Sequence, residues 1–446
     1  MNNKMESSLK LQMKLQNTRT PLTRLRHPLP IGWGEGRGEG HSEISPANPA
    51  WQEHKTMPNR ISAGVFSLCL ILAAGLTAAT AQEIVISKDY NPGNTKPIPI
   101  SMSGFSGEAA AVLQFDLFVQ GFGFTTPDAA QYLLTGSNGG NVQGQLSDRF
   151  NKKTMLSKSY TGAAMRRQAH ALADDVVEAI TGKKGIAQTK VAFKVEQSGN
   201  SEIYIADFDG HNAQAVTHDN TIIAAPAWVP GKLALYYTSY RLGNPDIYFQ
   251  DLSTGQRRTI ARYSGLNTSA APSPDGSKVA MILSKSGSPD VYVANADGSN
   301  LKQLTKTPED ESSPCWSPDG QWICFATRIN DRRVLCKVPA AGGETQRVST
   351  SGVSNPTEPD WSPDGKWIAF TAQMGDFQIC VVPAAGGSAT VLVSGEDPSW
   401  APNGRTVIYA RRQGGRYLLS LLDVPTKQVK DVSRISGSDS QPSWAK

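Results

Sequence analysis

Short apolar segments alternate with polar turns through the second half of the chain, and one sequence motif recurs there several times. In residues 359–373, PDWSPDGKWIAFTAQ, an apolar segment ends just before an S-P-D-G turn, and alternating apolar and polar positions follow the turn. Versions of this stretch occur at 271–284, 314–328 and 398–412. Alternation with a period of two predicts half-buried strands, and Pro followed by Asp and Gly favours a type I turn. Each stretch is therefore predicted to form a strand, a turn and a second strand.

The residue in front of each turn, the anchor, gives the length of the repeat. Successive anchors lie 44, 44, 45, 39 and 44 residues apart. A period of about 40 to 50 residues is typical of stacked supersecondary units. Each unit continues with a third strand, a second turn and a fourth strand, and no helix is predicted in it, which is the layout of a β-propeller blade. The anchors are Trp228, Pro272, Trp316, Trp361, Trp400 and Trp444.

The two ends of the repeat region complement each other. The chain stops just after Trp444, at the end of a lone first strand, whereas residues 190–193, 202–205 and 215–217 form a unit that lacks its first strand. Joining the two ends closes a ring of six blades and leaves no open sheet edge. We therefore predict a mainly β fold, a six-bladed β-propeller spanning residues 186–446.

The segment that precedes the propeller, residues 82–185, has a different pattern that mixes predicted helices with predicted strands. Apolar side chains cover most of a predicted helix at 107–120, and a second helix is predicted at 164–180 from its i, i+4, i+8 spacing. Helices and strands together in about a hundred residues predict a small α/β domain. Its strand at 97–102 contains two prolines, which cannot donate to a ladder, so we expect it at a sheet edge. Further strands are predicted at 132–134, 142–146 and 155–160.

The first 81 residues are expected to be absent from the mature protein. Residues 57–81 have a basic start, an apolar run and the A-x-A pattern of a secretory signal peptide, and the run is too short to span a membrane. Residues 1–56 would then precede a signal peptide. We interpret them as a mis-annotated or disordered extension with translation starting at Met57; a functional basic extension is the alternative.

The charge of the chain resides largely in that leader. Of 44 Lys/Arg and 39 Asp/Glu residues, the first 81 residues hold 9 and 5, so the remainder carries 35 and 34, a net charge of +1. This balance does not favour a nucleic acid or an anionic membrane surface as a partner.

The remaining cysteines and histidines do not fit a metal pattern. Four cysteines follow the leader, and Cys324 and Cys336 flank one predicted loop symmetrically, so a disulfide between them is one interpretation. The other is that all four are small buried side chains. His211 and His218 share one loop region, where a catalytic or metal role competes with a turn-capping or solvated one. The other two cysteines are Cys315 and Cys380.

Two sets of repeated residues could be mistaken for binding sites, but a role in stabilising the fold explains them better. Asp275, Asp319 and Asp364 recur in the S-P-D-G turns, where a carboxylate caps backbone N–H groups. The Trp anchors recur once per blade, so we expect core wedges between neighbouring sheets rather than a sugar-stacking set. No G-x-S-x-G nucleophile motif occurs, which weakens a hydrolase interpretation.

The order of these parts resembles that of the TolB family, the periplasmic propeller proteins of the Tol-Pal system. A predicted signal peptide is followed at once by the strand EIVISKD, then by a small α/β domain and six WSPDG-type blades. The junction ITGKKGIAQTKVAFKV and the first blade IYIADFDGHNAQAVTHDNTIIAAPAW are also in the style of that family. The resemblance covers about residues 83–446 and implies a non-enzymatic periplasmic protein. We expect no cofactor and predict no metal-binding residues, and the sequence leaves open whether a cation occupies the propeller funnel.

The resemblance implies two partners. Loops ahead of the anchors are expected to bind the peptidoglycan-associated lipoprotein, although Ser313 stands where a Glu is usual in the family. The alternating strand Glu83, Ile84, Val85 and Ile86, tethered by a Pro/Gly-containing connector, is expected to bind a TolA-like inner-membrane protein by strand addition; an ordinary edge strand is the alternative. The expected loop contacts are Leu266, Asn267, Thr268, Ser312, Ser313, Thr357, Glu358 and Asp397.

Three functional hypotheses follow. The first is a periplasmic adaptor that supports outer-membrane integrity and cell division. The second is an exported enzyme, such as a glycan lyase or hydrolase, which would need His or carboxylate clusters facing the propeller axis. The third is a secreted propeller that binds glycan or protein outside this system.

Overall fold

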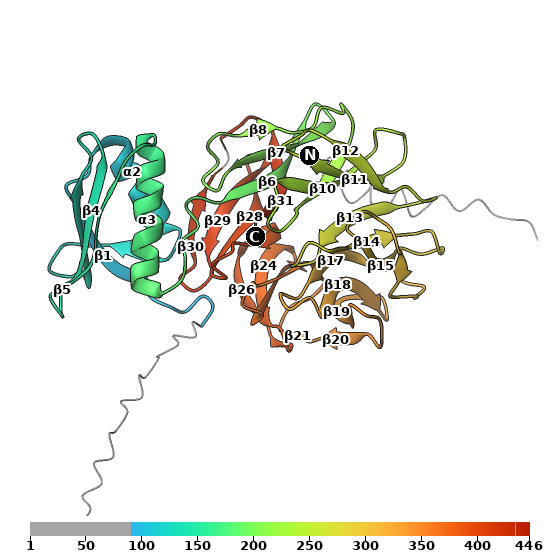
Figure 1. Ribbon diagram of the computed structural model, residues 1–446. Helices are drawn as coiled ribbons and strands as arrows, with labels where there is room; N and C mark the ends of the chain where they lie inside the picture. Colours follow the sequence, from blue (N-terminus) through green and yellow to red (C-terminus); the bar gives the residue numbers. More distant parts are fainter. Residues whose placement is uncertain (1–90, 433) are drawn as a thin grey trace, which may run out of the picture. The chain divides into compact units, whose positions relative to one another are not determined.

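Six four-stranded antiparallel sheets make up the propeller in the computed structural model, which describes residues 91–432 and 434–446 (Figure 1). The predicted leader and the predicted strand 83–87 lie outside the described residues. The blades are numbered in chain order, and each contains one anchor at the end of its first strand. The six-bladed β-propeller and the small α/β domain predicted from the sequence are both confirmed.

The strands of each blade follow one another from first to fourth. Blade 1 contains β31 (Ser438–Trp444), β6 (Lys190–Gln197), β7 (Asn200–Asp207) and β8 (Gln214–Ala215). Blade 2 contains β9 (Ile223–Trp228), β10 (Ala234–Ser239), β11 (Asp246–Asp251) and β12 (Arg257–Ala261). Blade 3 contains β13 (Asn267–Pro272), β14 (Lys278–Leu283), β15 (Asp290–Asn295) and β16 (Lys302–Gln303).

The second half of the ring repeats this order. Blade 4 contains β17 (Ser312–Trp316), β18 (Trp322–Ile329), β19 (Arg332–Pro339) and β20 (Gln346–Val348). Blade 5 contains β22 (Pro356–Trp361), β23 (Trp367–Met374), β24 (Asp376–Pro383) and β26 (Thr390–Ser394). Blade 6 contains β27 (Glu396–Trp400), β28 (Thr406–Gln413), β29 (Arg416–Asp423) and β30 (Gln428–Asp431). A short parallel pair, β21 (Thr350–Ser351) and β25 (Gly387–Ser388), links blades 4 and 5.

The C-terminal strand closes the ring as predicted. β31 pairs antiparallel with β6, from Ser438 opposite Glu196 to Trp444 opposite Val191, and lies beside it in Figure 1. The first strand of blade 1 is thus supplied by the last residues of the chain. Closure removes the free sheet edges that β6 and β31 would otherwise expose.

The Trp anchors fill the space between neighbouring blades. Trp400 and Trp444 are 0% and 1% exposed, and the other three Trp anchors are also buried. Trp400 packs in one cluster with Ala369 of blade 5 and Tyr409 of blade 6, so it bridges two sheets. This confirms their role as core wedges rather than a sugar-binding surface.

The S-P-D-G turns use their Asp residues as predicted. The Asp319 carboxylate accepts hydrogen bonds from the Ser317 hydroxyl and from the Gln321 N–H at 3.0 Å. Asp275 and Asp364 make the same pair of contacts in their own turns. These carboxylates therefore hold the turns, and the hydrogen bonds lower the pKa of Asp319.

The α/β domain is a five-stranded sheet covered by two helices. α2 (Gly107–Phe118) and α3 (Met165–Thr181) occupy the predicted positions, and α3 ends at Gly182, whose φ of 72° places it in the left-handed region that glycine favours. None of the helices in the described residues is sufficiently long and apolar to cross a membrane. The sheet order is β2 (Phe122–Phe124), β1 (Ile98–Ser103), β3 (Tyr132–Ser137), β4 (Val142–Asp148) and β5 (Lys153–Tyr160).

The expectation that the proline-containing strand lies at a sheet edge is wrong. β1 lies between β2 and β3 and is parallel to both. The Ile98 N–H points toward β2 and donates to the Gly121 carbonyl, whereas Pro97 and Pro99 point toward β3, whose pairing with β1 begins only at Ile100. No ladder hydrogen bond is therefore lost at either proline.

The interpretation of Cys324 and Cys336 as a disulfide is also wrong. Cys336 lies opposite Phe325 on the neighbouring strand, whereas Cys324 lies opposite Lys337 on one side and Cys315 on the other. Because side chains alternate between the faces of a strand, Cys324 and Cys336 belong to separate hydrophobic clusters. All four cysteines of the described residues are free and buried, in agreement with the second interpretation.

Because β31 closes the ring, we expect that replacing its anchor, Trp444, strongly lowers the stability of the fold. Trp444 is buried and its indole N–H donates to the Thr189 hydroxyl at 2.8 Å. We expect Trp444→Ala to lower the free energy of unfolding by about 3–5 kcal/mol, measured by urea unfolding. Trp367→Ala, at a half-buried position, is the control and should cost less. Equal losses in the two variants would contradict a closing role for Trp444.

Candidate functional site

The first strands of the six blades surround the propeller axis. They contact one another in cyclic order, which defines the inner-strand ring: β9, β13, β17, β22, β27, β31 and again β9. The predicted contacts ahead of the anchors fall in this ring rather than in loops, with the exception of Leu266, which precedes β13. The corrected location follows from the start of each first strand, which lies several residues before its anchor.

Every inner strand carries a β-bulge at the same place. The pairing register with the second strand shifts two to three residues before each anchor. The residue three positions before the anchor, called the bulge residue, has a φ between 51° and 56°. In five blades a proline follows it, which a bulge tolerates because the ladder is interrupted there. The bulge residues are Ala225, Ser269, Ser313, Glu358, Asp397 and Gln441.

Three bulge residues connect neighbouring blades. The Glu358 carboxylate accepts a hydrogen bond from the Asp397 N–H at 3.1 Å, and the Asp397 carboxylate accepts one from the Gln441 N–H at 3.1 Å. The Gln441 side-chain oxygen in turn accepts one from the Ala225 N–H at 2.9 Å. These side chains therefore clasp blades 5, 6, 1 and 2 to one another.

A second row of hydrogen bonds reinforces the same three junctions. The side chain just before one anchor accepts a hydrogen bond from the backbone N–H of the next anchor. The pairs are Asp360 with Trp400 at 2.7 Å, Ser399 with Trp444 at 3.1 Å and Ser443 with Trp228 at 3.1 Å.

The other three junctions are built differently. In residues 91–432 and 434–446, no side chain in either row bonds the backbone of the next blade at these junctions. Blades 2 and 3 are joined instead by the hydroxyls of Thr238 and Thr268 at 3.1 Å, and blades 3 and 4 by the Trp316 indole, which donates to the Ala271 carbonyl at 2.8 Å. The residues in the two rows are small: Ala225, Ala227, Ser269, Ala271, Ser313 and Cys315.

One predicted contact residue, Asn267, is buried and bonds only to groups of the chain itself. Asn267 is 0% exposed, and its amide donates to the carbonyl oxygens of Pro245 and Tyr263 while accepting from the Tyr263 N–H. Its side chain therefore holds the segment before β13 and is not exposed at the surface. The remaining predicted contacts in the inner-strand ring are half-buried, and we call this set the mouth: Thr268, Ser312, Ser313, Thr357, Glu358 and Asp397.

Carboxylates crowd one side of the mouth. Burial, together with the nearby Glu358, raises the pKa of Glu396 to about 7 and holds the pKa of Asp397 well above its ordinary value. The Thr371 hydroxyl donates to the Glu358 carboxylate at 2.6 Å. The carboxylates of Glu358 and Asp397 are thus engaged by blade-to-blade hydrogen bonds, which gives them a structural role in the ring.

Sequence reasoning missed the acceptors that clasp the blades. Gln441, Asp360, Ser399 and Ser443 look like ordinary polar residues near a Trp. The available clue was the proline that recurs two positions before five of the six anchors, because repeated prolines inside a predicted strand indicate a bulge. Within the described part of the chain, no group of three His, Cys, Asp or Glu side chains is arranged to hold a metal ion.

Comparison with known proteins identifies the family. A family model described as the TolB beta propeller domain matches residues 177–446. The chain belongs to the TolB family. This agrees with the resemblance carried by the WSPDG repeats and by the α/β domain in front of them.

Individual TolB relatives are similar over part of their length. The Tol-Pal system protein TolB of Nitrosomonas europaea is 29% identical over 213 residues, which cover 40% of this chain and 50% of the relative. The Mannheimia succiniciproducens protein of the same name is 33% identical over 37% of this chain and 40% of its own length. The aligned part of this chain thus spans half or less of these curated relatives.

A solved TolB structure shares the fold. The crystal structure of TolB from Acinetobacter baumannii superimposes with a TM-score of 0.72 and 24% sequence identity, over 80% of this chain and 98% of the other. The combination of an α/β domain with a propeller in this TolB-family chain therefore has a counterpart of nearly the same extent.

The clasps predict unequal effects of substitutions at equivalent positions. We expect Gln441→Ala to lower the free energy of unfolding by about 1–2 kcal/mol, because the Ala225 N–H loses its acceptor. Ser269→Ala is the matched control at another bulge and should cost less than about 0.5 kcal/mol. Urea unfolding followed by Trp fluorescence measures both. Indistinguishable midpoints would argue against the clasp.

The raised pKa of Glu396 predicts a dependence of stability on pH. The folded chain keeps this proton up to about pH 7, whereas the ordinary pKa is 4.5. The unfolded state therefore binds fewer protons between pH 4.5 and 7, and the free energy of unfolding falls as pH rises through this range. Glutamine does not titrate, so the free energy of unfolding of Glu396→Gln should not fall in this way. Relative to wild type it should rise by about 1–3 kcal/mol between pH 4.5 and 7.

Urea midpoints at pH 5 and pH 7.5 test this difference. Glu344→Gln, which replaces an exposed carboxylate, is the control and should follow the wild type at both pH values. If Glu396→Gln also follows the wild type, Glu396 does not keep its proton in the folded chain.

Proposed function

We propose that this TolB-family chain is a non-enzymatic periplasmic adaptor of a Tol-Pal system. In this proposal the mouth binds the peptidoglycan-associated lipoprotein. The segment Glu83–Ile86, outside the described residues, adds as a strand to a TolA-like inner-membrane protein. The adaptor thereby supports outer-membrane integrity and constriction during cell division. The observation that carries the proposal is the similarity of the repeats to curated proteins named Tol-Pal system protein TolB.

The geometry of the mouth supports binding to a partner rather than catalysis. Glu358 and Asp397, the two carboxylates of the mouth, accept hydrogen bonds from backbone N–H groups of neighbouring blades, which supports a structural use of these side chains. A rigid ring also presents half-buried side chains at low entropic cost, because the backbone is already ordered before a partner arrives.

The unclasped side of the mouth favours contact with a protein. Ser313 and Thr268 are small and half-buried, and Thr357 makes no side-chain hydrogen bond within the described residues. Small side chains around bulged strands leave room for partner side chains to approach the backbone. Ser313 in place of the family's usual Glu removes one charge from this surface, so the lipoprotein recognised here should carry a correspondingly less basic contact.

Calorimetric titration of the chain starting at Gln82 with the periplasmic domain of the lipoprotein from the same genome tests the proposal. We expect one-to-one binding with a micromolar or lower dissociation constant. Thr357→Arg places a long cation in the mouth and should weaken binding by about tenfold or more. Ser277→Arg, exposed in the turn at the other end of a blade, is the control and should bind like wild type. Absence of binding by the wild type would overturn the proposal.

A further inference from the structure

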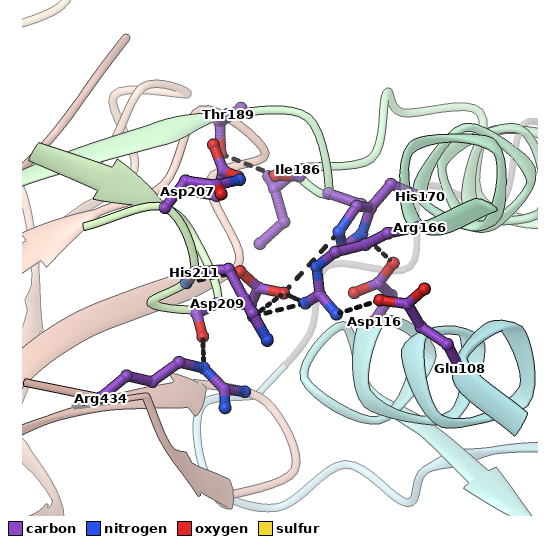
Figure 2. A network of polar contacts seen from close by, with 12 residues as sticks. Glu108, Asp116, Arg166, His170, Ile186, Thr189, Asp207, Asp209, His211 and Arg434 are labelled. Atoms are coloured by element: carbon purple, nitrogen blue, oxygen red, sulfur yellow. Dashed lines mark hydrogen bonds and ion pairs between the residues drawn. The ribbon is translucent and has the colours of Figure 1, made fainter. Parts of the chain in front are cut away.

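A polar cluster joins the α/β domain to blade 1, as Figure 2 shows. Helix α3 contributes Arg166 and His170, and α2 contributes Asp116. The turn between β7 and β8 contributes Asp209 and His211. The described residues of both parts belong to one compact unit, so this cluster is an internal contact of the folded chain.

The turn that carries Asp209 and His211 is held in place. The Asp207 N–H donates to the His211 carbonyl at 2.9 Å, and the Arg434 side chain donates to the Asp209 carbonyl at 3.0 Å. Gly210 has a φ of 80°, and a Cβ there would lie 1.8 Å from the Val432 carbonyl oxygen, so only glycine fits. The turn therefore presents its side chains to α3 in a fixed geometry.

Arg166 links the helix to this turn. Its guanidinium donates to the Asp209 carboxylate, which is buried, and contacts the Nδ1 atom of His211 at 2.6 Å. A guanidinium can only donate hydrogen bonds, so Nδ1 of His211 must accept one. In this contact His211 is therefore neutral and carries its proton on Nε2. Burial lowers the pKa of His211 to about 4, and the positive charges of Arg166 and Arg434 act in the same direction.

The His170–Asp116 pair lies beside this contact, and the two side chains together hold one titratable proton. Nδ1 of His170 lies 2.7 Å from the Asp116 carboxylate, and both side chains are buried. Burial raises the pKa of Asp116 and lowers that of His170 to about 4, so the pair is kept without net charge. An exposed pair would also hold one proton between pH 3.8 and 6.5, the ordinary pKa values. In that range the pair exchanges little proton with solvent when the contact forms.

The other charged groups around the cluster leave no unshared negative charge for a protonated His211. The Asp209 carboxylate lies 3.1 Å from Nδ1 of His211 and also accepts from Arg166, so two cations would have to share one carboxylate. Glu108 lies 3.8 Å from the Arg166 guanidinium, and Asp207 is bonded to Lys190 at 2.7 Å. Asp174 accepts from the Ala187 N–H at 2.8 Å. Protonation of His211 would therefore place a second cation against Arg166.

We propose that the contact between the α/β domain and blade 1 is a proton-sensitive latch, closed only while His211 is neutral and accepts from Arg166. Mild acid, by protonating His211, weakens this contact without unfolding the propeller. The inference concerns how the two parts of the chain are held together and does not rest on the proposed function.

The direction and size of the effect follow from proton linkage. Freed from the contact, His211 has its ordinary pKa of 6.5, whereas in the contact the value is about 4. The closed state therefore binds fewer protons, and closing becomes less favourable as pH falls from 6.5 to 4, by at most about tenfold per pH unit. Because His211 is 33% exposed, solvent screening reduces this effect. We expect the contact to weaken about 3- to 8-fold between pH 6.5 and 5, a range in which the His170–Asp116 pair exchanges little proton with solvent.

Hydrogen exchange of the mature full-length chain measures the latch. After correction for intrinsic exchange, amides of α3 and of residues 207–211 should open about 3- to 8-fold more at pH 5 than at pH 6.5. In His211→Asn, the amide oxygen can accept from Arg166 but cannot titrate, so opening should not depend on pH. His218→Asn, which replaces a histidine outside the cluster, should behave like wild type. All tryptophans of the described residues lie in the propeller, so their fluorescence verifies that the propeller stays folded.

Two results would overturn the latch. One is equal opening of wild type at the two pH values, and the other is pH-dependent opening that persists in His211→Asn. If His211→Asn does not fold, an NMR titration of the wild-type imidazoles decides. We expect a His211 pKa of about 4, and a value at or above the ordinary one would refute the proposal.

Discussion

Antiparallel pairing between β31 and β6 joins the last residues of the chain to the start of the propeller, and every other contact in the ring presupposes it. The Trp anchors are buried between their own blade and the preceding one, so a ring with one open junction would expose two sheet faces at once. The closing strand also contributes Gln441 and Ser443 to the clasps with blade 2. Closure thus supplies both hydrophobic packing and polar connections at the point where the chain ends meet.

The polar connections divide the ring into two unlike halves. Side-chain clasps join blades 5, 6, 1 and 2, whereas small residues line the remaining junctions. The α/β domain is bonded to the clasped half: the Thr406 hydroxyl of blade 6 donates to the Val119 carbonyl, and Arg166 reaches Asp209 of blade 1. The half that supports the second domain is therefore reinforced, and the half with small side chains is available for the proposed partner.

The sequence was sufficient for the architecture because the repeat leaves little freedom. The repeat has a period near 44 residues, a turn with fixed residues, a lone first strand at its C-terminal end and a unit without a first strand at its N-terminal end. These features admit few arrangements other than a closed ring of six blades. The single position of β1 inside its sheet was mispredicted, because a proline's missing N–H matters only on the side where a partner strand is present. That side depends on where β3 begins, which the local sequence does not specify.

The site was harder to predict for a related reason. The clasps pair residues such as Asp397 and Gln441, which are 44 positions apart. Both precede a Pro-Ser-Trp sequence, but this shared pattern does not show that one side chain bonds the backbone of the other. The latch residues Arg166 and His211 come from different domains, so their proximity depends on how those domains pack. The proline that follows five of the six bulge residues is the trace that this geometry left in the sequence.

Native-state hydrogen exchange of β31 tests the closed ring most directly. If the C-terminal strand closes the propeller, the amides of β31 that pair with β6 exchange only through global unfolding, with the same opening free energy as the central strand β28. Exchange of β31 amides at an opening free energy well below that of β28, under conditions where β28 remains protected, would show that the chain end is not part of the ring.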